Sequence, residues 1–130
     1  MLIFGHPFLP SEKFYHIDSP EAITSTPAGS TLLFAWNETN LDLAAHCRSN
    51  DLPFAIEVAS VKEALFAENV GARYLLVEGS LAKSVQRIAE TYLFDAKVLT
   101  RIDNETQLEP IAYEGIDGVV FAEAVVKVTA

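Results

Sequence analysis

The sequence predicts a single three-layer α/β domain with a mostly parallel sheet of about five strands, and two observations indicate this class. From residue 31 onward, short aliphatic runs alternate with longer amphipathic segments, which is the pattern of βα units. The runs lack the polar–apolar alternation of a half-exposed antiparallel sheet, so the strands are expected to be buried. Run starts recur roughly every 20 to 23 residues, which predicts compact units. A flavodoxin-like sheet and a half-barrel-like sheet both fit.

Composition limits the range of partners. The chain has 130 residues, of which 50% are hydrophobic and 21% are charged, as in a single globular domain. Its 18 acidic and 9 basic residues give a net charge of −9, which repels phosphate backbones and anionic membranes. Nucleic acid and membrane partners are therefore not expected. The single cysteine, Cys47, cannot form an intramolecular disulfide, which favours a cytoplasmic location.

The predicted elements alternate regularly. The strands are residues 31–36, 54–59, 74–78, 97–102 and 118–122. Ser60 and Glu63 have the spacing of a capping box, and Gly71 stands where that helix would end. In segment 80–92, Leu81 and Val85 share one helical face, whereas Gln86 falls on the polar face.

The segment after residue 103 contains a conflict. Asn104 to Gln107 resembles a second capping box, but Pro110 would then lie inside the helix, where it removes a hydrogen bond. This helix is therefore expected to start later or to kink.

Both ends of the chain lie outside the βα units, which cover residues 31–123. Residues 1–30 are predicted to be irregular, with short strands at 2–4 and 14–17. Residues 124–130 alternate as a strand with no helix to cover it. Because an uncovered edge invites pairing, we expect a homo-oligomer, most simply a twofold dimer. In the alternative, this segment pairs within its own chain, with the strand near Leu2.

Residues 53–123 contain related segments, since 70–78 and 114–122 both place a glycine before a strand. This stretch resembles successive units of a (βα) barrel. It is similar to the small sugar-acid aldolases in Ile56-Glu57-Val58. The Schiff-base chemistry of those enzymes needs a lysine directed into the site from a strand. Lys97 opens its strand at the opposite edge, so the resemblance does not extend to the catalytic lysine.

Common cofactor motifs do not occur in the chain. No GxGxxG follows a strand and no GxxxxGK[ST] occurs, so no nucleotide or other cofactor is expected. The three histidines are scattered, which argues against a metal centre. Cys47 is expected to be a packed residue of an amphipathic helix. His16 and Asp18 could share one strand face, and ordinary surface hydrogen bonding is the expected role of His16.

Polar residues gather where the predicted strands end, the edge at which open α/β sheets bind ligands. Glu57, Glu78 and Asp103 are the candidate catalytic or metal-ligating residues. The candidate ligand-binding residues are Asn37, Arg101 and Glu123. As a functional site they would form an acidic cleft with one arginine. As a structural feature, Glu57 or Glu78 would pair with Arg101. Glu57 is predicted to be mostly buried against a donor, because its strand is otherwise apolar.

The sequence does not decide whether this protein is an enzyme. We favour a non-catalytic interaction or regulatory domain, with a small polar ligand or a protein as its partner, because the common catalytic signatures do not occur. The alternative is a small metal-assisted or acid/base enzyme acting on an oxo-acid or sugar-acid. In that enzyme Glu57 would be the base or a ligand, and Arg101 would hold a substrate carboxylate.

Overall fold

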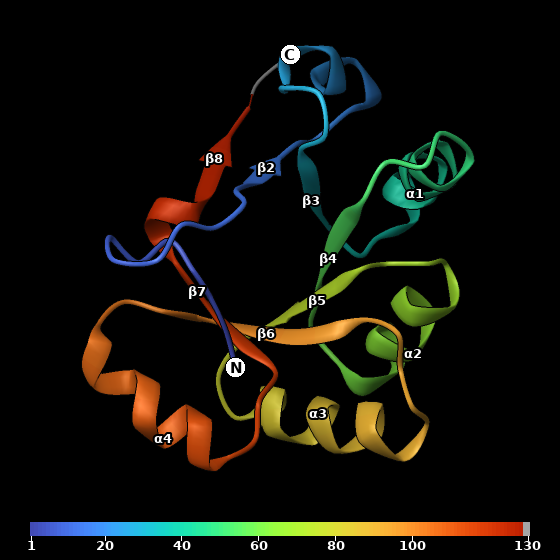
Figure 1. The fold of residues 1–130 in the computed structure, drawn as a ribbon. Coiled ribbons are helices and arrows are strands. Elements are labelled where there is room, and N and C mark those ends of the chain that lie inside the picture. The colour runs from blue at the N-terminus through green and yellow to red at the C-terminus, as the bar shows by residue number, and fades with distance from the viewer. Residues whose placement is uncertain (129–130) are drawn as a thin grey trace.

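The computed structural model describes residues 1–128 and confirms an α/β domain built on one parallel sheet (Figure 1). Eight strands form the sheet, and four α-helices lie between them in the chain. The elements are β1 (Leu2–Phe4), β2 (Phe14–His16), β3 (Thr31–Ala35), α1 (Leu41–Ser49), β4 (Phe54–Val58), α2 (Val61–Asn69), β5 (Tyr74–Val77), α3 (Leu81–Thr91), β6 (Lys97–Ile102), α4 (Leu108–Tyr113), β7 (Gly118–Phe121) and β8 (Val125–Lys127).

The sheet curls strongly, which brings its two ends close together. Its strand order is β1-β7-β6-β5-β4-β3-β2-β8, so β7 and β8 stand six places apart. Six strand spacings in a flat sheet would span about 29 Å. Only the turn Ala122–Ala124 joins these two strands, and the chain from Phe121 to Val125 reaches at most about 14 Å. The half-barrel alternative is therefore confirmed, and Figure 1 looks along the curled sheet.

The strand count differs from the prediction. The five predicted strands correspond to β3 to β7, and the helices follow where expected. The sheet has eight strands rather than about five because β1, β2 and β8 join it. These three strands have only three residues each, too few for a clear periodic pattern.

Of the predicted strand at 124–130, Val125–Lys127 form β8, Ala124 belongs to the preceding turn, and residues 129–130 lie outside the described residues. β8 pairs in parallel with β2 of its own chain, with Tyr15 opposite Val126. The alternative of pairing within the chain is thus the correct one, although the partner is β2 rather than the strand near Leu2. An uncovered segment therefore no longer supports a dimer.

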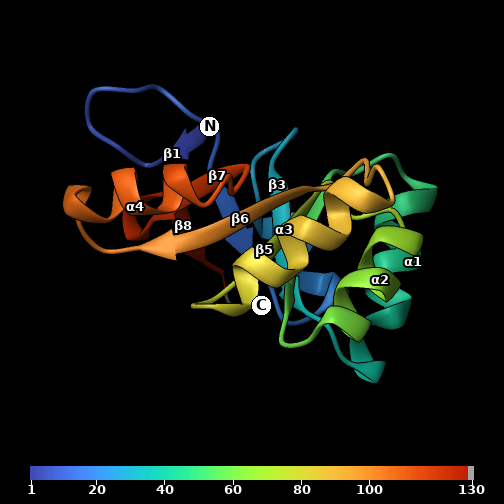
Figure 2. The ribbon, with the colours of Figure 1, turned by 90° about the horizontal axis from the view of Figure 1, so that it is seen from below.

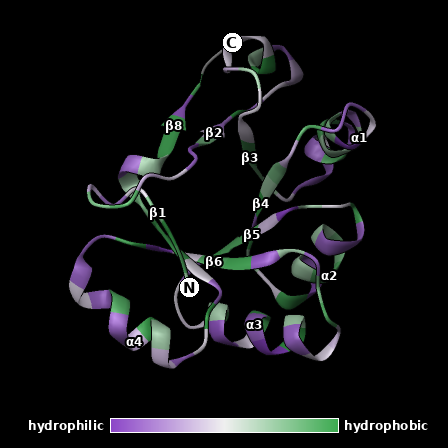
Figure 3. Cartoon of the chain, viewed as in Figure 1, coloured by the Kyte–Doolittle hydropathy of each residue, from purple (hydrophilic) through white to green (hydrophobic). Residues whose placement is uncertain are grey.

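From the axis of the curled sheet outwards, the interior core, the sheet and the helices form three layers. The helices cover its convex side (Figure 2), and Figure 3 colours many strand residues as apolar. One core packs the helices on the sheet and includes Leu75, Val85 and Val98. The second fills the concave side and draws on every strand. This interior core consists of Phe4, Phe14, Leu33, Ala55, Tyr74, Leu76, Leu99, Val120 and Ala124, with Val125 against it.

Local signals place the helices much as predicted. Ser60 Oγ accepts from the Glu63 N–H at 3.1 Å, while the Glu63 carboxylate accepts from the Ala59 N–H at 2.9 Å. Gly71 ends α2 with φ +96°. The helix containing Pro110 starts later, at Leu108, so the missing N–H falls in the first turn, where no intrahelical partner exists.

Gln86 departs from its predicted position on the solvent face of its helix, since it is 5% exposed. Its side chain accepts from the Asp117 N–H at 3.0 Å and donates to the Asp117 carboxylate at 3.1 Å. The same carboxylate accepts from the Val98 N–H at 2.9 Å. A polar residue on the edge of an amphipathic face is buried here because these hydrogen bonds satisfy it.

Gly118 allows β1, β6 and β7 to approach closely at the start of the sheet. A Cβ there would lie 2.7 Å from Leu99 Cδ2 and 2.8 Å from the Leu2 carbonyl oxygen. Leu2 and Leu99 are also its partners across the two strand pairs. The absence of a side chain at Gly118 is thus one of the features that let these three strands pack closely in the curled sheet.

Candidate functional site at the carboxyl ends of the strands

A charged layer lies directly above the interior core. Glu57 follows the core residue Ala55 by two positions, and Arg101 follows Leu99 in the same way. Side chains two apart on a strand share a face, so both point to the concave side at the carboxyl ends of β4 and β6. His16 stands in the same relation to Phe14 on β2.

Four side chains in this layer form a continuous chain of contacts, here called the ion-pair chain. Arg101 Nη2 lies 3.0 Å from Glu57 Oε2, and Arg101 Nη1 lies 3.1 Å from Glu78 Oε1. His16 Nε2 lies 3.1 Å from Glu57 Oε1. The predicted contact between Glu57 and Arg101 is therefore present, and Glu78 also reaches the guanidinium.

The ion-pair chain is half-open to solvent rather than buried. The side chains of Glu57, His16 and Arg101 are 26%, 32% and 37% exposed, and that of Glu78 is 69% exposed. Glu57 is thus more accessible than predicted, because it lies at the open end of the curl. Solvent weakens each attraction at such exposure.

Chemically, Glu57 holds its neighbours in position. Each of its two oxygens contacts a different cationic or donor group. When His16 is neutral, this contact favours the tautomer with the proton on Nε2, which leaves Nδ1 as an acceptor. The arrangement can therefore orient an imidazole beside an arginine, a geometry suited to acid/base chemistry.

The other predicted site residues lie apart from the ion-pair chain in the described structure. Asn37 caps the turn Glu38–Asn40, accepting from the Asn40 N–H at 3.0 Å and the Thr39 hydroxyl at 2.6 Å. Asp103 and Glu123 are exposed. Within residues 1–128, no group of three or more His, Cys, Asp and Glu residues could hold a metal ion.

The opposite end of the interior core carries a second cluster, which sequence reasoning missed. Glu12 accepts hydrogen bonds from the hydroxyls of Tyr74, at 2.8 Å, and Thr31. Burial, followed by the hydrogen bond from its hydroxyl to Glu12, raises the pKa of Tyr74 to about 12. Glu12 precedes Phe14 by two residues, so the alternation of β2 extended backwards would have placed it on this face.

A contact between distant segments fastens the long loop after β1. His6 accepts from the Phe8 N–H at 3.1 Å through Nδ1, and its Nε2 contacts the Glu105 carboxylate. The imidazole also lies edge-on to the rings of Phe8 and Phe121. No sequence pattern links His6 to Glu105, which are 99 positions apart.

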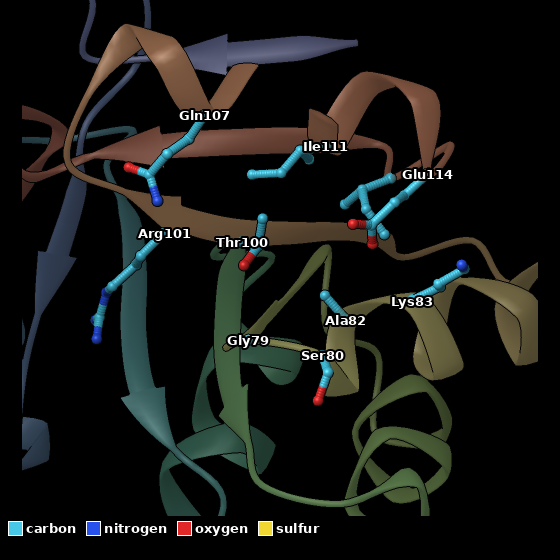
Figure 4. Close-up of a pocket in the computed structure, with 10 residues that line it drawn as sticks. Gly79, Ser80, Ala82, Lys83, Thr100, Arg101, Gln107, Ile111 and Glu114 are labelled. Carbon is cyan, nitrogen blue, oxygen red and sulfur yellow. The ribbon is translucent and has the colours of Figure 1, made fainter. Parts of the chain in front are cut away.

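A cavity of about 480 Å³ opens between α3 and α4, beside the ion-pair chain. Its lining includes Gly79, Lys83, Thr100, Arg101, Gln107 and Glu114 (Figure 4). The concave interior, by contrast, leaves no volume in which a water molecule would fit between Leu33, Leu76 and Val120. Space for a ligand therefore lies outside the sheet.

Cys47 packs as predicted. It is fully buried in α1, and burial raises the pKa of its thiol to about 11. A thiol that stays protonated at neutral pH is a poor nucleophile.

The longest helix of the described chain, α3, has 11 residues, and none of its helices could cross a membrane. No protein-family model matches this chain, and no curated protein matches it either.

Proposed function

We propose that this protein is a non-catalytic interaction or regulatory domain. The observation that carries the proposal is the ion-pair chain, in which Glu57 and Arg101 satisfy each other at the edge where a catalytic site would lie. Both oxygens of Glu57 are engaged, so it would have to give up a contact to take a proton from a substrate. The filled interior below it supports the same proposal, since no substrate fits there.

The second candidate is an acid/base enzyme acting on an oxo-acid or sugar-acid. The contact between His16 and Glu57 favours it, because a carboxylate commonly orients a catalytic imidazole. Arg101 would hold a substrate carboxylate. In a metal-assisted enzyme, Glu78 and Asp103 would be the further metal ligands. Asp103 does not join the ion-pair chain in the described structure.

The two functions make different predictions for Glu57→Gln. If the ion-pair chain is structural, the variant puts an amide donor against Arg101 or His16, and unfolding becomes easier by about 1 kcal/mol. If the ion-pair chain serves catalysis, Glu57→Gln should be as stable as the wild type or more stable. The reason is that charged groups of an active site are kept for activity even where they lower the stability of the fold. Thermal unfolding of both proteins measures the difference, with the exposed Glu109→Gln as a matched control.

A turnover assay completes this test. Wild type and Glu57→Gln are incubated with small 2-oxo acids and sugar acids, and substrate loss is followed by NMR. Turnover by the wild type that Glu57→Gln abolishes, together with unchanged stability, would overturn the proposal in favour of the enzyme.

A cytoplasmic twofold dimer is part of the proposal. Its support is the exposure of large apolar side chains, since Phe8, Leu93 and Tyr113 are 83%, 84% and 90% exposed. Exposed apolar side chains supply contact area for a partner where they lie in one patch. Light scattering at micromolar concentration tests it, and a monomer mass would reject the dimer without touching the rest of the proposal.

A further inference from the structure

We infer that the exposed side of α3 is the contact surface of the twofold dimer proposed above, and that it packs antiparallel against α3 of a second copy of this chain. The inference rests on that dimer and names its surface. Both ends of α3 carry features that lower the stability of a single chain. Contact with a second copy relieves these features.

The first feature is the backbone of Leu93, the residue directly after the C-cap of α3, which is left-handed with φ +52°. The Phe94 N–H donates to the Ala89 carbonyl at 2.9 Å, the hydrogen bond of a Schellman motif. At the same position after α2 and α4 the chain has Gly71 and Gly115. A bulky residue in this conformation costs stability that glycine would not cost. Leucine thus stands where the fold favours glycine.

The side chain of Leu93 does not offset this cost by packing in its own chain. It is 84% exposed, and Tyr92 beside it is 67% exposed. Two adjacent exposed apolar side chains present contact area to a partner. Burial of a leucine side chain in a dimer is favourable, so a partner that covers Leu93 supplies the compensation that the single chain lacks.

The second feature is the charge order along α3. The helices α1, α2 and α4 each have an acidic residue in the first turn, whereas α3 (residues 81–91) has none there and no basic residue in its last turn. Lys83 lies in the first turn and Glu90 in the last, the order that the helix dipole disfavours. Both are exposed, and neither forms an ion pair within residues 1–128. Glu90 accepts only a long hydrogen bond from Gln86, at 3.5 Å.

Antiparallel packing of α3 on a second copy brings these opposite charges together. The start of one helix then faces the end of the other, so Lys83 of each copy lies beside Glu90 of the partner subunit. The two helix dipoles also oppose each other, which is favourable. A twofold contact joins the same surface of both copies, so each pairing occurs twice. This self-complementary charge pattern is the reason to assign the surface to a second copy, although each chain carries a net charge of −9.

The same arrangement gives Leu93 a place to pack. The end of α3 in one copy reaches the start of α3 in the other, where the cavity of about 480 Å³ opens. Ser80, Ala82 and Ile111 line this cavity (Figure 4). A cavity of about 150 Å³ already holds a benzene molecule in another protein. The volume beside α3 therefore admits a leucine side chain of the second copy.

Leu93→Gly tests the surface directly, and Leu41→Ala, at an exposed position on α1, is its control. Analytical ultracentrifugation of the full chain from about 2 to 200 µM covers dimers of moderate affinity. Leu93→Gly should weaken the dimer about tenfold or more, while Leu41→Ala leaves it unchanged. A dimer that Leu93→Gly does not weaken would overturn this inference and leave the proposed dimer standing. A wild-type monomer at every concentration would reject the dimer and a second copy as the occupant of α3.

The melting temperature of the dilute monomer separates contact from folding. Leu93→Gly should raise it by about 2–4 °C, because glycine adopts the left-handed conformation without the cost that leucine incurs. A stabilised monomer that associates poorly is the expected combination. A lower melting temperature would show that Leu93 serves the fold of its own chain, and would overturn its role in the contact.

Charge reversal tests the antiparallel direction. Lys83→Glu and Glu90→Lys should each weaken the dimer about fivefold, and the double variant should restore it, because each copy again presents opposite charges to the other. Lys62→Glu, at an exposed position on α2, changes the net charge equally and should have little effect. Equal weakening by Lys62→Glu, or a double variant that stays weak, would overturn the antiparallel contact. These results are independent of the stability of Glu57→Gln.

Discussion

The two ends of the interior core are closed in different ways. At the amino ends of the strands, the carboxylate of Glu12 accepts from Thr31 and Tyr74, whose residues are 1% and 8% exposed. At the carboxyl ends, Glu57 and Glu78 surround an arginine that is itself 37% exposed. The buried hydroxyls at the first end are both satisfied by hydrogen bonds to one carboxylate. Charges in contact with solvent can exchange partners, so the second end is the more adaptable of the two.

The largest expected effect comes from the core between the two ends. Phe14 is 2% exposed and packs edge-on against Phe4 and Tyr74, with ring centroids 5.1 Å and 5.4 Å apart. Phe14→Ala should lower the free energy of unfolding by about 3–5 kcal/mol, measured by urea denaturation. Phe8→Ala, at an exposed position, should change it little. Similar losses in both variants would contradict the assigned interior.

Removing Arg101 tests the carboxyl end. Arg101→Met removes the cation that Glu57 and Glu78 share, and should lower the free energy of unfolding by about 1–2 kcal/mol. This is less than the cost of breaking a fully buried ion pair, because solvent screens these charges. Arg101→Met combined with Glu57→Met should cost less than Arg101→Met alone. Arg87→Met on the exposed face of α3 is the control for the loss of a cation. Strictly additive costs would mean that the pair is not coupled.

Removing one hydroxyl tests the amino end. Tyr74→Phe deletes the hydrogen bond to Glu12 and should lower stability by about 1 kcal/mol. Tyr113→Phe, at a position that is 90% exposed, should be neutral. If Tyr74→Phe were neutral as well, the contrast between a hydrogen-bonded end and an adaptable end would be wrong.

A separate effect appears only in alkaline solution. The pKa of Tyr74 is raised from 10 to about 12, and that of Cys47 from 9 to about 11. The unfolded chain therefore loses these protons at lower pH than the folded protein, so stability falls as pH rises from 9 to 12. Tyr74→Phe should remove the loss of stability that occurs between pH 10 and about pH 12. Cys47→Ala should remove the loss that occurs between pH 9 and about pH 11. The free energy of unfolding is measured as a function of pH. If its dependence on pH were the same in both variants as in the wild type, this would count against these pKa shifts.

Local signals in the sequence predicted the βα units, because caps such as Ser60 and the periodicity of α3 depend on neighbouring residues. The curl of the sheet could not be predicted this way, since it follows from the pairing of β2 with both β3 and β8. Burial of Gln86 also depends on a distant partner, Asp117. The individual helices and the longer strands could therefore be predicted from the sequence, while the curl of the sheet could not.

At the candidate site, the contact of Glu57 with Arg101 was predictable because both residues lie late in their strands. β5 separates β4 from β6, and the curl brings the two side chains together on the concave side. His16 joined unexpectedly, since its place depends on the short strand β2. The cavity beside α3 depends on how two helices pack, which residue types alone do not show.

The join of β7 to β8 also bears on how the protein is made. β8 follows every other strand in the sequence, so a ribosome releases the residues that complete the curl after all the strands they must meet. Until then the nascent chain holds an unclosed sheet with its apolar concave side accessible. Contacts between segments so far apart form slowly, and exposed sheet edges favour aggregation. The pairing of Val125–Lys127 with β2 is therefore the step that can complete the sheet only after all the other strands have been made.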